Sequence, residues 1–344
     1  MIRAAGVGDI IALKQLRQYM PISVNGATSP SAWTSLLALS SAFPPGGRTT
    51  VSLVYVENGQ LWGSVQARAR RKRHEWEIIS LSGIGQVNDS PELLPEKVFA
   101  SLLEQLARIL GERGAMRIFA KSPGDVPGFA AFALAGYSVY GHEDLFRLDG
   151  ASALGVRGAT PPFAQEPGLP EGATIRPQRD DDAWPIHQLY GSITPKVMQQ
   201  AQGLSSDDWG LPKGRWPGNL FTSKEGRYVL EVEGQVQGFV LATRATNTLE
   251  IMVHPEAYHH AAALLRQGLS ELAPAAGIYC ALPEHQGGLS HVLEETGFRH
   301  LGSQALLVKH MVTRIRERER VLKPVLERGL EPAAKAPIYS NQKP

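Results

Sequence analysis

The clearest alternation of apolar and polar positions lies in the second half of the chain. Apolar residues on both sides of Glu233-Gly234 predict a β-hairpin, because glycine readily takes the positive φ that tight hairpin turns require. The apolar and β-branched run at 248–253 predicts a third strand, which Pro255 ends because proline cannot donate to a sheet. Leucines and alanines at 261–272 then recur at the spacing of one helical face. The predicted order is hairpin, strand, helix.

The same order occurs earlier in the chain. Apolar runs within 51–67 flank Asn58-Gly59, a dipeptide strongly typical of hairpin turns. Residues 75–81 predict a third strand, and leucines within 98–110 predict an amphipathic helix. The remaining predicted elements are an opening strand at 1–4, a helix that Asp9 caps and that runs through Met20 until Pro21, a strand at 116–120, a helix at 128–135 and a last strand at 137–148.

These two sets of elements are copies of one pattern. A shift of 175 positions moves Gly59, Leu61 and Gly63 onto Gly234, Val236 and Gly238. A shift of 161 moves Gly136-Tyr137 onto Gly297-Phe298, and Ile2-Arg3 reappears as Ile175-Arg176. The repeat predicts two domains, at 1–148 and 174–312, joined by a proline-containing linker at 149–173.

The end of the chain has a different character. Residues 313–330 alternate in charge and predict a helix, which either docks on a partner or lies solvated on its own domain. Residues 331–344 are rich in proline and alanine and predict a disordered tail.

Composition narrows the class of protein. The 344 residues are 43% hydrophobic and 20% charged, which is typical of a globular protein, and a net charge of +2 gives no strong case for nucleic acid or membrane partners. Cys280 is the single cysteine, so neither an intrachain disulfide nor a cysteine-based zinc cluster can form. With no long apolar segment in the sequence, we expect a cytoplasmic protein.

The order of elements resembles that of the GNAT acetyltransferase superfamily, and the chain resembles a tandem pair of such domains. Val253-His254-Pro255 looks like the V-x-P element that closes the family's central strand, and Gly297-Phe298 looks like the end of its short helix. The resemblance implies an α/β (α+β) fold with two GNAT-like domains, each a mixed, mostly antiparallel sheet flanked by helices. It also implies transfer of an acetyl group from acetyl-CoA to an amine.

The family binds acetyl-CoA with a glycine-containing loop after the central strand, where helix-start amides hold the pyrophosphate. By this resemblance the cofactor-binding residues are Met252, Val253, His259, His260 and Ala261. The loop at 256–262 departs from the pattern because it has no glycine. In the first copy, Gly83-Ile84-Gly85 keeps two glycines, but acidic residues and prolines follow before the helix.

The acid and base positions also follow the resemblance. Many relatives deprotonate the amine with a carboxylate on the central strand, for which Glu250 in the second copy and Glu77 in the first are the candidates. The alternative is that each is a solvent-facing strand residue. The tyrosine that often protonates the thiolate is replaced by Phe132 and Leu293, so Tyr258 or Tyr279 would have to substitute.

Three other groups suggest weaker possibilities. His254, His259 and His260 cluster in sequence, but neighbouring histidines at a helix start point apart, so we expect no metal site. The basic run at 68–74 either contacts nucleic acid or an acidic partner, or is a solvated turn. The tryptophans that either line a groove between domains or pack in the core are Trp184, Trp209 and Trp216.

Two functions remain open from the sequence. One is an acyl-CoA-dependent N-acetyltransferase with one working copy, the second, acting on a small-molecule or peptide amine. The other is a catalytically inactive tandem GNAT-like scaffold for binding or assembly. An enzyme should keep an open cleft with free backbone amides beside Val253, whereas in a scaffold side chains such as Tyr258 or His260 should fill it.

Overall fold

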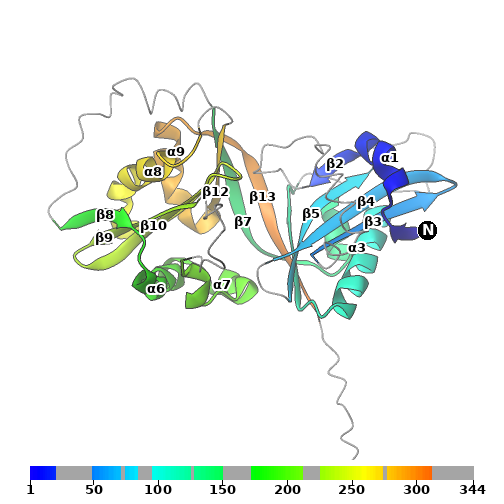
Figure 1. Cartoon of the computed structure of the whole chain (residues 1–344), viewed down its shortest axis with the longest axis horizontal. Helices are drawn as coiled ribbons and strands as arrows, with labels where there is room; N and C mark the ends of the chain where they lie inside the picture. Colours follow the sequence, from blue (N-terminus) through cyan, green and yellow to red (C-terminus); the bar gives the residue numbers. More distant parts are fainter. Residues whose placement is uncertain are drawn as a thin grey trace, which may run out of the picture. The chain divides into compact units, whose positions relative to one another are not determined.

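Two sets of elements with the same order make up the structure, which is a computed structural model (Figure 1). The structure describes residues 1–20, 49–70, 74–83, 95–124, 128–149, 172–211, 225–273 and 277–311. The predicted helix at 313–330, the predicted tail at 331–344, Trp216, most of the predicted linker and residues 71–73 of the basic run lie outside the described residues.

The first half opens with a short strand and a short helix, and a hairpin follows. Its elements are β1 (Ile2–Ala4), η1 (Val7–Asp9), α1 (Ile10–Gln15), β2 (Arg17–Met20), β3 (Thr50–Glu57), β4 (Gln60–Ala69), β5 (Glu75–Gly83), α3 (Pro95–Glu112), β6 (Arg117–Ser122), α4 (Gly128–Leu134) and β7 (Ser138–Leu148). The predicted hairpin is confirmed, with Asn58 at φ 51° and Gly59 at φ 77° in its turn.

The second half repeats the order with longer helices before its hairpin. Its elements are β8 (Ala173–Pro177), η3 (Asp180–Asp182), α6 (Ala183–Ile193), α7 (Lys196–Gln202), η4 (Ser206–Trp209), β9 (Glu225–Val232), β10 (Gln235–Thr243), β11 (Thr248–Val253), η5 (Pro255–His260), α8 (Ala261–Leu269), β12 (Ile278–Pro283), η7 (Glu284–Leu289), α9 (Ser290–Glu295) and β13 (Arg299–His310). Glu233 and Gly234 have φ of 51° and 78°, so both hairpins use the same turn geometry.

The predicted helix from Asp9 through Met20 is wrong in its second part. Helix α1 ends at Gln15, and β2 then pairs antiparallel with β5, with Arg17 opposite Gly83. The edge of β5 offers backbone hydrogen-bonding groups that need partners, and this contact between distant segments outweighs the local helical spacing.

All thirteen described strands belong to one sheet, which is antiparallel except for the β5–β6 and β11–β12 pairs. The last strand of each half pairs with the other half. Strand β13 lies between β6 and β7, and β7 lies between β13 and β12 (Figure 1). The halves have therefore exchanged their last strands.

The two main hydrophobic cores show the same exchange. Leu307 of β13 packs in the core of the first half, and Phe146 and Leu148 of β7 pack in the core of the second half. The boundaries at 1–148 and 174–312 stay predictions, and the exchange shows that each core needs residues from both ranges.

The pairing of β7 with β13 is symmetric under the repeat. Residues related by the shift of 161 exchange places in the pairs Leu306 with Gly141 and Gly302 with Leu145. Glu143 lies directly opposite its own counterpart, Gln304. A pseudo-two-fold axis therefore passes between Glu143 and Gln304.

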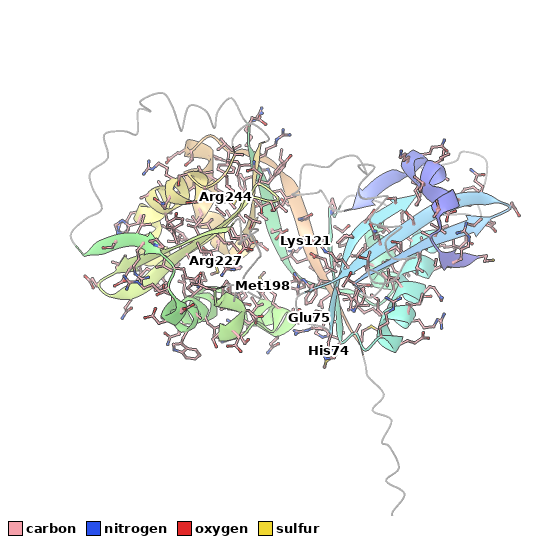
Figure 2. All side chains as sticks on the ribbon, viewed as in Figure 1. His74, Glu75, Lys121, Met198, Arg227 and Arg244 are labelled. Carbon is pink, nitrogen blue, oxygen red and sulfur yellow. The ribbon has the colours of Figure 1, made fainter. Side chains whose placement is uncertain are left out.

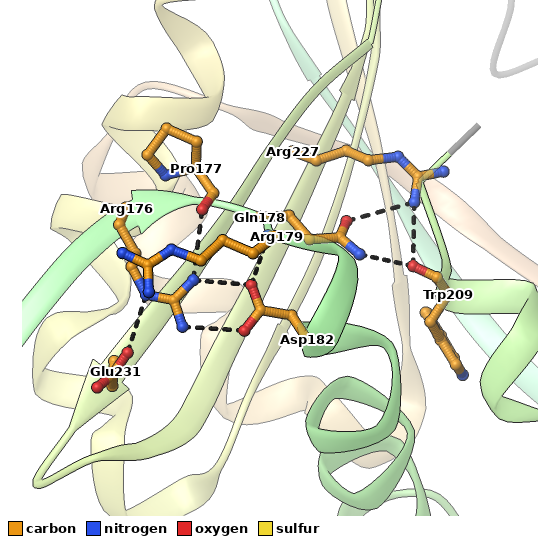
Figure 3. Close-up of polar contacts among 8 residues, drawn as sticks. All are labelled: Arg176, Pro177, Gln178, Arg179, Asp182, Trp209, Arg227 and Glu231. Carbon is orange, nitrogen blue, oxygen red and sulfur yellow. Dashed lines mark hydrogen bonds and ion pairs between the residues drawn. The ribbon is translucent and has the colours of Figure 1, made fainter. Parts of the chain in front are cut away.

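Matching ion pairs hold the start of both halves. Arg3 makes a bidentate contact with Asp9, at 2.6 and 2.7 Å, and Arg176 makes the same contact with Asp182, at 2.7 and 2.9 Å (Figure 3). Arg176 also donates to Glu231 of β9 at 2.9 Å. Each pair ties a first strand to the turn that opens the first helix.

The sheet of the second half is covered on both faces. Val229 and Phe239 pack against α6, while Leu230 and Val240 pack toward α8. This is the alternation expected of strands buried on both sides. Among the described residues, no helix has both the length and the apolar character needed to cross a membrane.

Candidate functional site

A cavity of about 570 Å³ lies where the two halves meet. Its floor is the sheet face formed by strands of both halves, with Lys121 of β6 near the centre. Its other wall is formed by α6, α7 and η4, which contribute Tyr190, Met198 and Trp209. Met198 and Lys121 are labelled in Figure 2. The cavity therefore exists because the two halves share one sheet.

A polar network occupies the pseudo-two-fold axis on the cavity floor. The Oε1 atom of Glu143 accepts hydrogen bonds from Lys121 Nζ at 2.7 Å and from Gln304 Nε2 at 2.7 Å. Burial disfavours the Lys121 ammonium, but the attraction and hydrogen bond of Glu143 outweigh this effect, so the pKa of Lys121 lies above its usual value. Lys121 and Glu143 are thus a charged pair within the first half, and the hydrogen bond from Gln304 connects it to the second half.

Glu250 faces the cavity from β11. Leu249, Ile251 and Val253 point into the core beneath α8, so Glu250 and Met252 point to the opposite face. The Glu250 carboxylate is reached by solvent within the cavity, yet protein surrounds it. This desolvation raises the pKa of Glu250, and nearby Lys121 only partly opposes it.

Glu77 is not the first-half counterpart of Glu250, contrary to our expectation. Leu241 pairs with Glu250, and its repeat counterpart Gln66 pairs with Ser80. A register shift next to this pair places Glu77 opposite Arg68 instead. Glu77 does line the cavity, 3.9 Å from Arg68, but the position of the central carboxylate is taken by a serine.

In the second half, β11 and β12 separate along their length, and a side chain hydrogen-bonds to the edge of β11 that this split exposes. Strands β11 and β12 pair only at Thr248–Tyr279 and Leu249–Cys280, and they are unpaired beyond those residues. The Val253 backbone N–H donates to Gln286 Oε1 at 3.0 Å, and Gln286 is 1% exposed. The amide that an acyltransferase needs free is therefore occupied.

Residues after β11 are also engaged within the chain. The Ala261 N–H donates to the Tyr258 carbonyl, and the Ala257 N–H donates to the His254 carbonyl at 2.9 Å. The ring of Tyr258 lies so close to Gly288 that a Cβ there would collide with it. These contacts argue against a phosphate cradle at this helix start.

The two predicted histidines of this loop differ in environment. His260 is buried. Its pKa is lowered mainly by this burial and to a smaller extent by the neighbouring His259. His259 is exposed, with its ring 3.8 Å from that of His260. The binding roles predicted for His259, His260 and Ala261 stay predictions, and the structure places none of the three on the cavity wall.

In the first half, β5 and β6 also separate, and a strand covers the edge of β5 that this split exposes. Strands β5 and β6 pair from Glu75 to Glu77, and the same edge of β5 then pairs with β2 at Leu81, Ser82 and Gly83. Phe99 of α3 packs behind this edge, where a Cβ on Gly83 would lie 2.6 Å from its ring. The backbone edge that the split exposes is thus covered in the described residues of this half.

Other predicted residues are distributed as follows. Trp209 lines the cavity, whereas Trp184 is exposed. Tyr279 lies on β12 with the Arg147 guanidinium 5.5 Å from its ring, and Cys280 is fully buried. Among the described residues, no group of three or more histidine, cysteine or carboxylate side chains is placed to hold a metal ion.

The sequence analysis missed three residues of the site. Lys121, Glu143 and Gln304 are polar residues within strands that are otherwise largely apolar on their buried positions. A charged residue inside such a strand is the signal that could have identified Lys121. Its partners could not be identified, because they come from exchanged strands.

Solved structures of acetyltransferases are similar to this chain. A GCN5-related N-acetyltransferase from Sphaerobacter thermophilus aligns with 90% of this chain and 95% of its own, at 13% identity and a TM-score of 0.52. This chain has the GNAT fold. A tandem GNAT protein from the clavulanic acid biosynthesis pathway is also similar, at 14% identity over 90% of this chain and 98% of that chain, with a TM-score of 0.45. A putative acetyltransferase from Pyrococcus horikoshii is similar at 14% identity over 91% of this chain and 90% of that chain, with a TM-score of 0.45.

Searches by sequence add no further relative, since no protein-family model and no curated protein matches the chain. Within the GNAT fold, β5 and β11 are the central strands of the two halves, and β6 and β12 are the strands that split from them. The predicted tandem GNAT fold is confirmed.

Proposed function

We propose that this GNAT-fold protein binds a small polar molecule in the cavity between its halves and does not use acyl-CoA as a substrate. The observation that supports this most is the occupied edge of both central strands. Strand β2 covers β5, and the Gln286 side chain accepts the Val253 amide hydrogen. An acyltransferase of this fold would use that amide to polarise the acyl carbonyl.

The loop after β11 supports the same proposal. Binding a pyrophosphate takes free amides at a helix start, usually beside glycines that let the phosphate approach. Here η5 runs directly into α8, and the Ala261 amide is bonded to Tyr258. Acyl-CoA binding would require this turn to unwind.

The cavity itself has the properties of a ligand site. Its volume lies within the roughly 300–1,000 Å³ of small-molecule pockets. Three residues of its wall each have a buried side-chain atom with no hydrogen-bond partner in the part of the chain that the structure describes, namely Gln304 Oε1, Gln286 Nε2 and His285 Nδ1. Buried polar atoms normally have partners, and a bound ligand or water would supply them.

A cavity-filling variant tests this proposal. Met198 is a buried cavity residue of α7, and its neighbour Val197 is 62% exposed. We expect a thermal-shift screen of small polar metabolites to find ligands for the wild-type protein and for Val197→Trp, but not for Met198→Trp. Ligands that stabilise all three proteins equally, or a screen that finds none, would contradict the proposal.

A second candidate function is N-acetyl transfer in the second half, with Glu250 as the general base. Two observations favour it: the raised pKa of Glu250 suits a base near neutral pH, and the cavity reaches both Met252 and Pro283 on either side of the split. Gln286 would then have to rotate away from Val253. Acetyl-CoA-dependent acetylation of an amine panel, lost in Glu250→Gln, would establish this candidate.

A further inference from the structure

The charged side chains of the cavity do not cancel locally. Lys121 is paired with Glu143 at 2.7 Å, and Arg68 lies 3.9 Å from Glu77. Arg70 and Glu250 remain. Among the described residues, no carboxylate lies within ion-pair distance of Arg70, and no basic group lies within that distance of Glu250. The cavity thus has one unpaired positive group, from the first half, and one unpaired negative group, from the second half.

The Glu250 side of the cavity needs hydrogen-bond donors. Gln304 is 1% exposed, and its amide orientation is set by donation from Nε2 to Glu143. Its Oε1 atom is left as an acceptor without a partner. Glu143, Gln304 and Glu250 all line the cavity. A group with several N–H donors and a positive charge fits there, as an ammonium does.

The Arg70 side presents donors held in place. Its guanidinium lies 4.4 Å from the centre of the Phe119 ring, and Phe119 packs edge-on against Tyr140 with 6.2 Å between ring centres. A guanidinium stacked on a ring keeps its planar donors available for a carboxylate. Arg70 is exposed, so an anion can reach it.

We propose that the ligand of the cavity is amphoteric, with an ammonium group that binds Glu250 and a carboxylate group that binds Arg70. This inference rests on the proposed binding function and names its ligand class. One such molecule neutralises both unpaired charges. Apolar residues such as Met198 and Leu306 also line the cavity and can contact the apolar middle of such a ligand.

The test is calorimetric titration with ω-amino acids from glycine to 8-aminooctanoate, together with the alkylamine and the alkanoate of each chain length. We expect one amino acid to bind about tenfold or more tightly than its matched amine and acid. Glu250→Gln and Arg70→Gln should each lower the affinity for that amino acid by a similar factor. Only Glu250→Gln should lower the affinity for the matched amine. Matched controls on exposed side chains are Glu256→Gln and Arg108→Gln.

The outcomes separate this inference from the binding function. Equal affinity for the amino acid and its amine, or no effect of Arg70→Gln, overturns the amphoteric ligand and leaves the cavity as a binding site. The amphoteric ligand is likewise overturned if no probe binds while the Met198→Trp screen still identifies other ligands. If that screen also finds no ligand, both proposals fail. Circular dichroism of each variant checks that it is folded.

Discussion

In the first half, the edge of β5 beyond β6 is paired with a strand, β2. In the second half, the matching edge of β11 is met by a single side chain, Gln286. The repeat preserved the scaffold around these edges but not the means of covering them. A backbone edge must find partners, and each half has found them from a different part of its sequence.

A second contrast lies on the pseudo-two-fold axis. A symmetric repeat places the same position of both copies face to face, so two glutamates there would repel. The chain has Glu143 in one copy and Gln304 in the other, and Gln304 donates to Glu143. Lys121 pairs with Leu306 in the sheet, and the matching pair in the other copy is Ala281 with Leu145. The positive charge that balances Glu143 is therefore present in only one copy. The difference between the copies at the axis gives a hydrogen-bonded network in place of a repulsion.

The exchanged strands should give the largest effects on stability. Phe146 is 2% exposed and packs in the core of the second half, although it comes from the first. We expect Phe146→Ala to lower the free energy of unfolding by about 3–5 kcal/mol. Urea unfolding should show one shifted transition, because each core depends on both halves.

Leu307→Ala is the reciprocal change, with an expected loss of about 2–5 kcal/mol, and Leu134→Ala is the control on an exposed residue. Two separate transitions, with only one of them shifted by each mutation, would contradict the role of the exchange.

The axis contrast should give the next largest effect. Gln304→Glu would place two carboxylates opposite each other, and we expect it to cost about 1–3 kcal/mol at neutral pH. The repulsion raises a pKa in the folded state above the unfolded value of about 4.3, so the loss should grow as pH rises through that window. Denaturation curves at several pH values measure it. Gln235→Glu, at the exposed first residue of β10, should cost nothing measurable, and equal costs for both variants would contradict the symmetry argument.

The side-chain cover of β11 should have a smaller effect. Gln286→Ala removes the acceptor of the Val253 N–H, and we expect a loss of about 1 kcal/mol. Hydrogen exchange of the Val253 amide should become faster, while Gln286→Glu, which keeps an acceptor, should preserve its protection. Unchanged exchange in Gln286→Ala would show that Gln286 is not what covers this edge.

Glu250 should give the smallest effect, and its sign is informative. Its folded-state pKa is raised, so ionising it costs stability as pH rises above the unfolded value of about 4.3. Glu250→Gln should therefore melt slightly higher than wild type near pH 8 and equally near pH 4. Glu256→Gln, on an exposed side chain, should show no such trend. A lower melting temperature for Glu250→Gln at high pH would mean that the carboxylate is stabilised by a partner.

Local patterns in the sequence were enough for the elements and the repeat. Both hairpins follow from turn residues whose conformation is set locally, at Asn58-Gly59 and Glu233-Gly234. Strand alternation likewise identified Glu250 as a residue on the face opposite the core. The second part of the predicted helix from Asp9 to Met20, which forms β2, was mispredicted because its partner in β5 lies more than 60 residues away.

The exchange of β7 and β13 could not be predicted from the sequence. The repeated sequence pattern is the same whether the last strand of each copy packs with its own copy or with the other one. For the same reason the pairing of Glu143 with Gln304, 161 positions apart, has no local signal. The register shift that separates Glu77 from Ser80 is also invisible in the composition of β5. The sequence therefore predicts the scaffold well and the cavity poorly.

Calorimetric titration of the wild-type protein with acetyl-CoA tests the central claim most directly, with coenzyme A alone as the parallel titration. Our account predicts no heat of binding at millimolar ligand, because β2 and Gln286 cover the two edges that the acyl group would need. Micromolar affinity, equivalent to about −8 kcal/mol, would contradict it and would support the acetyltransferase candidate with Glu250 as the base.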